Sequence, residues 1–400
     1  MGGPTSGHRW PTDGRHPPES RDNPGMNERP FDAAPLQQAL DLARQAIALS
    51  EPNPRVGCVL VAPDGRVIGQ GHTQRAGGPH AEVMALRDAE ARGEHPQGAT
   101  AYVTLEPCAH HGRTPPCADA LVRAGVARVC VALLDPNPLV GGQGVARLRA
   151  AGIAVDVLPP DDALAVAARE LNIGFLSRMV RQRPWVRMKV AGSLDGRTAL
   201  ANGQSQWITG EAARADGQVW RARAGAVLTG IGTVRDDNPR LDVRSMVVAR
   251  QPVRVVMDAR WETPADARLL DEPGQAWVMG LNAASAPAAL AARATLIEVA
   301  PDASGARVDW AGALQELGRR GINELHVEAG ARLNASLIQG GWVDEVLVYL
   351  APCLIGPGRG LAELPALTQL ADAWRLRFHE VAQVGDDLRL RLRPLQPPGF

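Results

Sequence analysis

The feature that most constrains this chain is the triplet His80-Ala81-Glu82, taken together with two cysteines farther along, Cys108 and Cys117. One imidazole and two thiolates supply three ligands for a tetrahedral zinc ion and leave the fourth position open. Structural zinc sites are closed by a fourth Cys or His, so a set of three ligands is typical of a catalytic site. Glu82 lies two residues after His80 and is left to carry protons at the open position.

The same residues match, with one departure, the H-x-E and P-C-x-x-C signature of zinc enzymes that deaminate nucleobases. The second half begins at Pro107-Cys108, but Cys117 follows nine residues later because a loop is inserted. In such enzymes zinc activates a water that attacks an amidine-like ring carbon, and a carboxylate carries the proton to the departing ammonia. A lone H-x-E triplet is usually part of an ordinary helix, so the prediction depends on the two downstream cysteines.

Composition limits the classes of protein that the chain can belong to. Its 400 residues favour two domains, and a formal net charge of zero argues against a broad basic face for nucleic acid. No apolar run is long enough to cross a bilayer, and the start lacks the apolar core of a signal peptide. Five cysteines, an odd number, favour a reducing compartment. We therefore expect a cytoplasmic protein in which Cys58, Cys130 and Cys353 pack in the core.

The order of elements predicts an α/β protein of two domains, after a disordered tail at residues 1–30 that is too polar to bury a core. The first domain is expected at residues 31–180 and the second at 181–400, divided near Arg181-Gln182-Arg183-Pro184. Helical spacing predicts helices after Asp32, after Pro79 and from Cys117, and a closing helix from Leu164 to Met179. Strands are expected at residues 56–62, 67–71, 101–105, 128–134 and 153–158, and then at 186–190, 226–229, 253–257, 276–279, 324–327 and 345–349.

Several longer motifs add a resemblance to a known family. The chain resembles the bifunctional deaminase/reductase of bacterial riboflavin biosynthesis over roughly residues 32 to 395, and the inserted loop between the cysteines is part of that resemblance. The motifs that carry it are Pro52-Asn53-Pro54, Gly71-His72, His80-Ala81-Glu82, Pro107-Cys108 through Cys117, Asp135-Pro136-Asn137-Pro138, Lys189 through Arg197, Ser205-Gln206-Trp207-Ile208-Thr209, Thr229 through Leu241, and Val327-Glu328-Ala329-Gly330. One departure is Ala329, where many members have a second glycine.

The resemblance implies a cytidine-deaminase-like α/β/α layered domain followed by a dihydrofolate-reductase-like α/β domain. The first would use Zn²⁺ to remove the 2-amino group from 2,5-diamino-6-ribosylamino-4(3H)-pyrimidinone 5′-phosphate. The second would use NADPH to reduce the ribosyl side chain to ribityl, giving 5-amino-6-(5-phospho-D-ribitylamino)uracil. The expected partner is this small-molecule substrate, without nucleic acid or membrane. The oligomeric state stays open, a homo-oligomer being one outcome.

The resemblance also implies roles for single residues. In the front domain His80, Cys108 and Cys117 would bind the metal, Glu82 would be catalytic and Asn53 would contact substrate. In the rear domain the expected cofactor contacts are Ala191, Trp207, Thr233, Asp237, Gly330, Ala331, Arg332, Leu333, Asn334, Ala335 and Ser336. The expected substrate contacts there are Ser205, Arg221, Leu241, Arg244 and Glu328.

Physical reasons support part of the rear assignment. A strand that ends in Val327 and a helix that starts after Gly330 would aim free backbone N–H groups at a pyrophosphate. Guanidinium groups pair bidentately with phosphate, which suits Arg221 and Arg244. Without the resemblance, a plain strand-to-helix connection explains the first pattern equally well, and a solvated arginine or a core Trp207 is the commoner case.

Two other functions compete with this interpretation. A zinc deaminase that acts on a base within RNA would need a basic and aromatic groove, which zero net charge and 4% aromatic residues disfavour. A zinc-stabilised interaction module without catalysis would need a fourth Cys or His ligand, and the constellation offers none clearly. Ammonia release from the pyrimidine phosphate, compared with release from RNA, separates the three functions.

Overall fold

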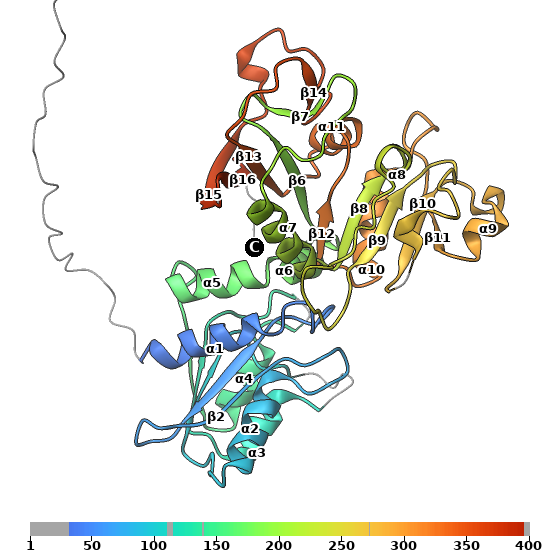
Figure 1. Ribbon diagram of the computed structural model, residues 1–400. Helices are drawn as coiled ribbons and strands as arrows, with labels where there is room; N and C mark the ends of the chain where they lie inside the picture. The colour runs from blue at the N-terminus through green and yellow to red at the C-terminus, as the bar shows by residue number, and fades with distance from the viewer. Residues whose placement is uncertain (1–31, 110–114, 138–139, 272, 396–400) are drawn as a thin grey trace, which may run out of the picture.

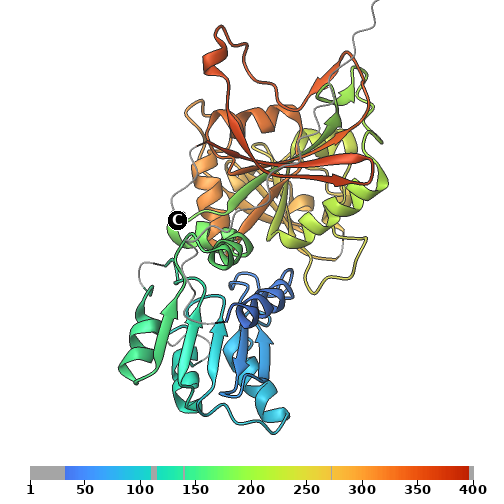
Figure 2. The same ribbon diagram turned by 90° about the vertical axis from the view of Figure 1, so that its left-hand side faces the viewer.

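The computed structural model describes residues 32–109, 115–137, 140–271 and 273–395, and it contains two units that are built on separate sheets. The predicted tail at residues 1–30 lies outside the described residues, and so do His110 and His111 in the loop between Cys108 and Cys117. We call the unit built on the five-stranded sheet the front unit and the unit built on the nine-stranded sheet the rear unit. Figures 1 and 2 show them one below the other, with α5 and α6 between their sheets.

The front unit is a mixed sheet between two layers of helices. Its strand order is β2-β1-β3-β4-β5, with β1 antiparallel to both neighbours and the remaining pairs parallel. One core cluster joins the sheet to α2, α3 and α4, and another joins it to α1 and α5, so the predicted α/β/α layering is confirmed. The elements are α1 (Ala34–Arg44), β1 (Gly57–Val61), β2 (Val67–His72), α2 (Ala81–Ala91), β3 (Thr100–Val103), α3 (Cys117–Ala124), β4 (Arg128–Val131), α4 (Gln143–Ala150), β5 (Ala154–Val157), α5 (Ala163–Leu171) and α6 (Ile173–Arg181).

The closing helix is divided, which corrects the single helix expected from Leu164 to Met179. α5 ends and α6 begins at Asn172, which is 2% exposed. The side-chain oxygen of Asn172 accepts the backbone N–H of Arg55 at 2.7 Å, and its amide donates to the carbonyl of Arg55 at 3.0 Å. This contact spans 117 positions of sequence, so helical periodicity along the segment could not reveal the break.

The rear unit is organised around a long twisted sheet in the order β11-β10-β9-β8-β12-β6-β13-β16-β15. Strands β11 to β13 in this order are parallel, and β16 and β15 add an antiparallel edge. The elements are β6 (Trp185–Ser193), β7 (Arg197–Leu200), α7 (Glu211–Arg223), β8 (Ala226–Gly230), α8 (Ile231–Asp237), β9 (Val253–Met257), β10 (Ala276–Gly280), α9 (Ala288–Ala291), β11 (Thr295–Glu298), α10 (Trp310–Arg319), β12 (Glu324–Val327), α11 (Ala331–Gln339), β13 (Glu345–Ala351), β14 (Gly358–Gly360), β15 (Leu376–Val384) and β16 (Asp387–Pro394), with short 3₁₀ turns at Arg268–Leu270, Ala283–Ser285 and Leu370–Asp372.

Three core clusters hold the rear sheet. One face packs through Met188, Leu228 and Val255 onto residues of α10 and α11 such as Leu314 and Leu337. The other face packs at β9 and β10 onto α8 and the segment around Trp261, and at β13 onto α7. The strands are short apolar runs because both faces of a parallel sheet are covered, which explains why the six strands expected in this half are all present.

The hairpin of β15 and β16 was not among the expected strands. In β16 leucines alternate with Arg389, Arg391 and Arg393, and such a row of arginines resembles a solvated polar face. Those arginines instead pair with Glu345, Glu380, Glu170 and Asp216 on neighbouring elements. Apart from Glu380 on the adjoining β15, the paired carboxylates come from distant parts of the chain, so the tertiary structure accounts for this edge of the sheet.

The cysteines and the surface complete the description. All five thiols are free; Cys58 and Cys130 are buried as expected, but Cys353 is exposed just beyond β13, which corrects its expected place in the core.

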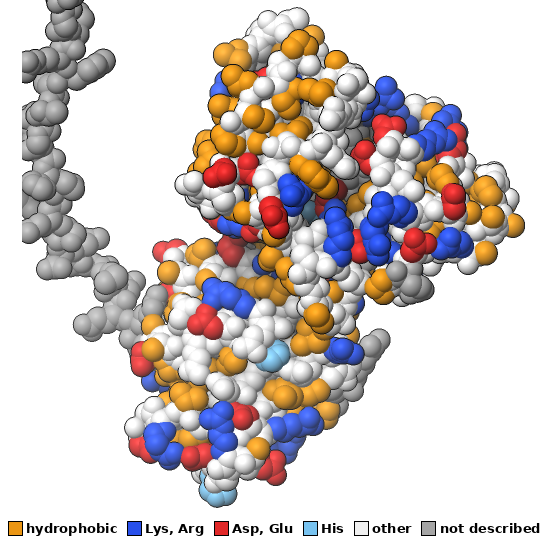
Figure 3. All heavy atoms as spheres, viewed as in Figure 1, with side chains coloured by type: hydrophobic (Ala, Val, Ile, Leu, Met, Phe, Trp, Pro, Cys, Tyr) orange, Lys and Arg blue, Asp and Glu red, His pale blue; other side chains and the backbone are white. Residues whose placement is uncertain are grey.

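Acidic and basic side chains are interspersed on the face shown in Figure 3. Within the described residues, no helix combines the length and the apolar character that crossing a bilayer requires.

Candidate active sites

His80, Cys108 and Cys117 converge on one point of the front unit. Their Nδ1 and Sγ atoms all lie within 4.8 Å of one another. The Nδ1 of His80 is 3.7 Å from the Sγ of Cys108 and 3.3 Å from the Sγ of Cys117. Zinc bound tetrahedrally at about 2.0 Å from nitrogen and about 2.3 Å from sulfur would set these nitrogen–sulfur separations at about 3.5 Å. The donor set and its spacing therefore fit zinc.

The ends of three elements bring these ligands together. His80 is the N-cap of α2, Cys117 is the first residue of α3, and Cys108 follows β3. The backbone N–H of Cys117 donates to the Sγ of Cys108 at 3.3 Å, and the start of α3 favours negative charge at these sulfurs. Gly71 of β2 permits the approach of α2, because a methyl group there would lie 2.7 Å from the carbonyl oxygen of Ala81.

The protonation of this cluster follows from its mutual contacts. A hydrogen bond from Cys117, then contacts with His80 and the Cys117 backbone, lower the pKa of Cys108 to about 4. The same hydrogen bond, with burial, raises the pKa of Cys117. The pair thus holds one thiolate and one thiol, and the remaining thiol would lose its proton to solvent when a cation binds.

Glu82 lies beside the ligands in the first turn of α2 and is 3% exposed. Burial, followed by the negative charge of Cys108, raises the pKa of Glu82 to about 7. A carboxyl group with a pKa near neutrality exchanges protons efficiently in both directions. Glu82 is therefore suited to general acid–base work, as its place in the H-x-E triplet predicts.

Glu106 is a supporting residue that the sequence did not single out. Its carboxylate is buried and accepts the backbone N–H groups of Asp135, Gly142 and Val145 at 2.9–3.0 Å. These bonds tie the loop before α4 to the residue that precedes Pro107-Cys108. The available signal was an acidic residue at the end of a buried strand, next to a metal ligand, where a carboxylate needs partners.

In the rear unit, α8 and α11 begin side by side. Each follows a parallel strand, β8 and β12, and these strands are neighbours in the sheet. A methyl group on Gly330 would lie 3.7 Å from the Oγ1 of Thr233, and one on Gly230 would lie 2.9 Å from Leu333. Open α/β sheets bind ligands at the carboxyl ends of such strands. Thr233 and Gly330, both expected at the cofactor, are thus brought together.

The expected cofactor segment at residues 330–336 divides into two groups. Gly330 is the N-cap of α11, and the N–H groups of the first turn after it have no partner within the helix. Asn334 and Ala335 are 2% and 4% exposed, and the hydroxyl of Ser336 accepts the indole N–H of Trp310 at 2.9 Å. The side chains of these three residues face the protein, so a cofactor would meet mainly Gly330, Ala331, Arg332 and Leu333.

Arg221 and Glu328 form an ion pair next to this edge. The Nη2 of Arg221 donates to the Oε2 of Glu328 at 2.9 Å, its Nε donates to Oε1, and its Nη1 donates to the carbonyl of Asp242. Three of the five guanidinium N–H groups are therefore engaged. Arg244 differs, because its side chain is 52% exposed and contacts the carboxylate of Asp242. Of the two arginines expected at a phosphate, Arg244 is the more accessible.

Lys189 is the only lysine of the chain, and no role was assigned to it from the sequence. It lies on β6, and burial lowers its pKa, while the charge of Glu328 opposes that effect and Arg221 adds to it. Its ammonium also lies 5.8 Å from the ring of Tyr349. A single lysine among so many arginines was the signal available in the sequence, because a compact ammonium and a planar guanidinium are not interchangeable.

The remaining predicted residues are more dispersed. Leu241 is buried at a positive φ of 56°, and Ala191 is opposite Tyr349 in the pairing of β6 with β13. Trp207 is 66% exposed beneath the guanidinium of Arg214, two residues after the half-buried Ser205.

Two further predicted residues lie on other elements. Asp237, the last residue of α8, is exposed. Asn53, in the front unit, lines a cavity of about 10 Å³ at the junction of the units. These positions stay predictions.

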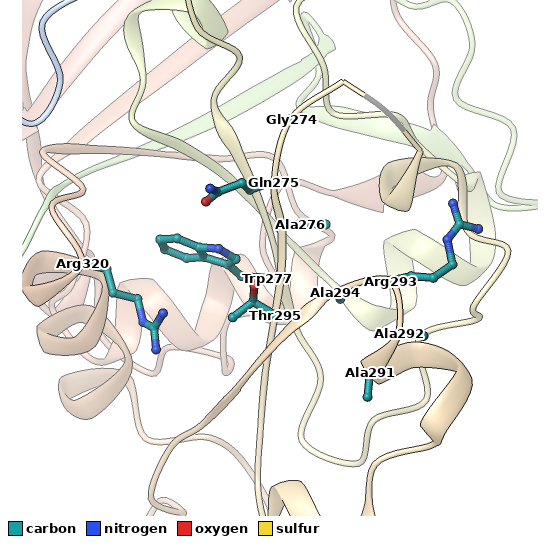
Figure 4. A pocket seen from close by; sticks show the side chains of 10 residues that line it. All are labelled: Gly274, Gln275, Ala276, Trp277, Ala291, Ala292, Arg293, Ala294, Thr295 and Arg320. Atoms are coloured by element: carbon teal, nitrogen blue, oxygen red, sulfur yellow. The ribbon is translucent and has the colours of Figure 1, made fainter. Parts of the chain in front are cut away.

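A larger hollow of about 480 Å³ lies elsewhere (Figure 4). It is lined at the amino ends of β10 and β11 by residues that include Trp277, Arg293 and Arg320. The amino ends are opposite the edge where α8 and α11 begin, and the lining contains none of the predicted site residues. We therefore do not place the reductase site in this hollow.

Comparisons with known proteins agree with this architecture. Residues 31–133 match the family model of the cytidine and deoxycytidylate deaminase zinc-binding region, and residues 184–390 match that of the RibD C-terminal domain. The riboflavin biosynthesis protein RibD of Escherichia coli is 45% identical over 89% of this chain and 98% of its own length.

Two solved structures are similar over nearly the whole chain. RibD of Acinetobacter baumannii has a TM-score of 0.81 and 45% identity, and covers 91% of this chain and 98% of its own. A diaminohydroxyphosphoribosylaminopyrimidine deaminase/5-amino-6-(5-phosphoribosylamino)uracil reductase of Thermotoga maritima has a TM-score of 0.80 and 31% identity, and covers 90% of this chain and 98% of its own.

Fold, site and comparisons define a two-domain enzyme that joins a zinc-dependent deaminase to a reductase. The chain belongs to the RibD family, the bifunctional deaminase/reductases of riboflavin biosynthesis. Its cofactors are Zn²⁺ and NADPH, and its substrate is a small molecule.

Proposed function

We propose that the front site removes the 2-amino group of 2,5-diamino-6-ribosylamino-4(3H)-pyrimidinone 5′-phosphate, and that the rear site then reduces the ribosyl chain. The observation that carries the proposal is the convergence of His80, Cys108 and Cys117 beside the buried Glu82. The three ligands would hold zinc, which when bound supplies an activated water. The named activity of the Thermotoga maritima relative supports the choice of substrate.

Glu82 is the proton carrier of the deamination. Its raised pKa lets the carboxylate accept a proton from the attacking water and deliver it to the ring nitrogen and the departing ammonia. Burial of the carboxyl keeps these transfers away from bulk water. Asn53 remains our candidate for a substrate contact, because its segment leads into β1 of the same unit.

The rear site binds NADPH across the starts of α11 and α8. Unpaired N–H groups at Gly330–Leu333 suit the pyrophosphate, and Thr233 lies next to Gly330. Ala191, Trp207 and Asp237 complete our assignment on the cofactor side. NADPH, when bound, supplies the hydride for the reduction.

The pyrimidine substrate lies against the pair of Arg221 and Glu328. Arg244, which is half exposed, would bind the phosphate, and the remaining N–H groups of Arg221 would assist it. Ser205 and Leu241 complete the assigned pocket. Lys189 adds a half-buried positive charge beside Glu328.

The extents of the domains and the location of the protein belong to the same proposal. We assign the deaminase to residues 31–180 and the reductase to residues 181–400, supported by the separate sheets and by the two family matches. Five free thiols, two of them at a metal site, support the cytoplasm. Neither nucleic acid nor membrane is part of the proposed function.

One assay tests the deaminase. Ammonia release is measured from the diaminopyrimidine phosphate, from an RNA of mixed sequence and from buffer, together with the zinc content of the enzyme. We expect about one zinc per chain and release from the pyrimidine phosphate alone. Release from RNA would indicate a nucleic-acid deaminase, and a zinc-loaded protein that releases no ammonia from either would contradict the proposal.

A further inference from the structure

The side chain of Arg55 reaches from the front unit into the rear unit. Arg55 precedes β1, and its side chain is 7% exposed. Its Nη1 donates to the Oε1 of Glu324 at 2.6 Å and to the carbonyl of Leu171 at 2.9 Å, and its Nη2 donates to the carbonyl of Arg223 at 2.7 Å. One guanidinium thus bonds to α5 within the front unit and to β12 and the last residue of α7 in the rear unit.

The contact at Arg223 falls on the end of α7. The last carbonyls of a helix have no partner within it and carry its negative dipole, so a buried guanidinium there stabilises that turn. The guanidinium of Arg223 also pairs with Glu324, at 2.8 Å. Burial alone would raise the pKa of Glu324, yet Arg223, Arg55 and Arg187 hold it well below its ordinary value.

The same turn of α7 carries Arg221, two residues before Arg223. α7 and the β12 segment are therefore joined by two ion pairs, Arg223 with Glu324 and Arg221 with Glu328. The first pair also binds Arg55, and the second faces the proposed substrate pocket. Both ion pairs depend on the position of α7 along β12. A shift of α7 that alters the Arg223–Glu324 pair would therefore also move the Arg221–Glu328 pair.

We propose that Arg55, a residue of the deaminase unit, is a positioning residue of the reductase: by holding the end of α7 it sets the Arg221–Glu328 pair that receives the pyrimidine substrate. This inference rests on the proposed function, which places that pair in the substrate pocket. Under this proposal, the rear active site is correctly assembled only when the front unit is docked against the rear unit.

The test is steady-state reduction of pre-deaminated substrate by the full-length holoenzyme, with Arg55→Met compared with the wild type. Losing the charged hydrogen bonds should raise KM for the pyrimidine by about tenfold and leave KM for NADPH within about twofold. A defect of folding would lower kcat without changing KM. An unchanged KM for the pyrimidine would overturn the proposal.

Arg178 supplies a matched control. It is also an arginine at the junction, where its Nη2 donates to the carbonyl of Pro52 at 2.9 Å and its Nε donates to the Oδ1 of Asn323 at 2.6 Å. Both of these partners lie off α7. Arg178→Met should therefore leave KM for the pyrimidine near the wild-type value. An equal rise in both variants would show general loosening of the junction and contradict the specific role of Arg55.

Two further variants separate this inference from the proposed pocket. Arg55→Lys keeps a positive charge near Glu324 but lacks the planar fork that also reaches the Arg223 carbonyl. Its KM for the pyrimidine should therefore lie between those of the wild type and Arg55→Met. A wild-type KM would contradict the proposal that Arg55 holds the end of α7.

In an Arg221→Ala background, Arg55→Met should add no further rise in KM for the pyrimidine, because both residues act through α7. Additive effects on KM would contradict the proposed role of Arg55. If Arg221→Ala alone leaves reduction normal, the proposed pocket itself fails.

Discussion

The imidazole nitrogen of the front site lies about as far from each of the two sulfurs as zinc ligands require, and Glu82 lies buried beside them. The arrangement uses three ligands from three element ends, which leaves the fourth tetrahedral position for substrate chemistry. Removing any one ligand leaves only two, which is too few to hold the ion firmly. At the scale of residues, metal binding and deamination therefore depend on the same side chains.

Replacing Cys117 tests the ligand set. In Cys117→Ser the poorer hydroxyl ligand should reduce zinc from about one ion per chain to a small fraction, and ammonia release should disappear with it. Metal analysis of the purified variant checks this. Cys353→Ser, at an exposed cysteine far along the chain, is the control and should keep its zinc. A Cys117→Ser protein with full zinc would remove Cys117 from the ligand set.

Replacing Arg244 tests phosphate recognition in the rear site. A charged hydrogen bond contributes roughly 1.5–3 kcal/mol, so Arg244→Ala should lower kcat/KM of reduction by about ten- to a hundredfold for the phosphorylated substrate. The dephosphorylated substrate should be poor with the wild type and no worse with the variant. Equal losses for both substrates would contradict the assignment. Arg221→Ala should differ, because it also strips Glu328 of its partner and so affects both substrates.

At the scale of elements, the start of α11 is the feature that most directly concerns NADPH. Gly330 caps the helix with a φ of −75°, which any residue adopts, and a Cβ there meets only ordinary contact. Gly330→Asp should preserve the helix, since Asp is a good N-cap, but its charge would oppose the pyrophosphate. We expect the Kd for NADPH to rise by about tenfold or more relative to the neutral Gly330→Asn. Fluorescence titration measures both, and equal Kd values would place the pyrophosphate elsewhere.

The elements also show how far local sequence determines the structure. The front helices follow mainly from apolar spacing, and at the start of α1 the carboxylate of Asp32, one residue before the N-cap Ala33, accepts the N–H of Ala34 at 3.0 Å. The ligands His80, Cys108 and Cys117 follow from motif chemistry, because few residue types bind zinc. The break at Asn172 and the paired arginines of β16 depend on partners more than a hundred positions away or on other strands. Arg55 escaped notice for the same reason, and Glu106 did because its partners lie in a loop and a helix 29 to 39 positions away.

At the scale of the whole molecule, buried carboxylates hold the junction of the two units, through Glu324, and the rear sheet, through Glu345. Glu324 and Glu345 are each almost inaccessible, and their arginine partners hold both pKa values well below the ordinary value despite burial. A carboxylate whose folded pKa is depressed contributes stability above its unfolded pKa of about 4.3, and that contribution is lost as the pH falls toward the folded pKa. Acid should therefore weaken the junction and the rear sheet together.

Denaturant unfolding at several pH values tests this account. The midpoint for the wild type should fall steadily from about pH 5 down to about pH 2, between the unfolded pKa and the depressed folded pKa values. Glu324→Gln should be less stable at pH 7 by about 3–5 kcal/mol, because three arginines lose a buried partner, and its midpoint should change less with pH. A variant whose midpoint falls as steeply as that of the wild type would show that Glu324 contributes little to the acid response.

The central claim is that one chain deaminates first, through Glu82, and reduces afterwards at a separate site. The most direct measurement follows ammonia release and NADPH oxidation in the same sample of zinc-loaded Glu82→Gln enzyme. From the diaminopyrimidine phosphate we predict that both signals fall by at least about a hundredfold, because the reductase receives no product. From pre-deaminated substrate NADPH oxidation should stay near the wild-type rate. Normal ammonia release from the zinc-loaded variant, or rapid NADPH oxidation with the diamino compound, would contradict the account.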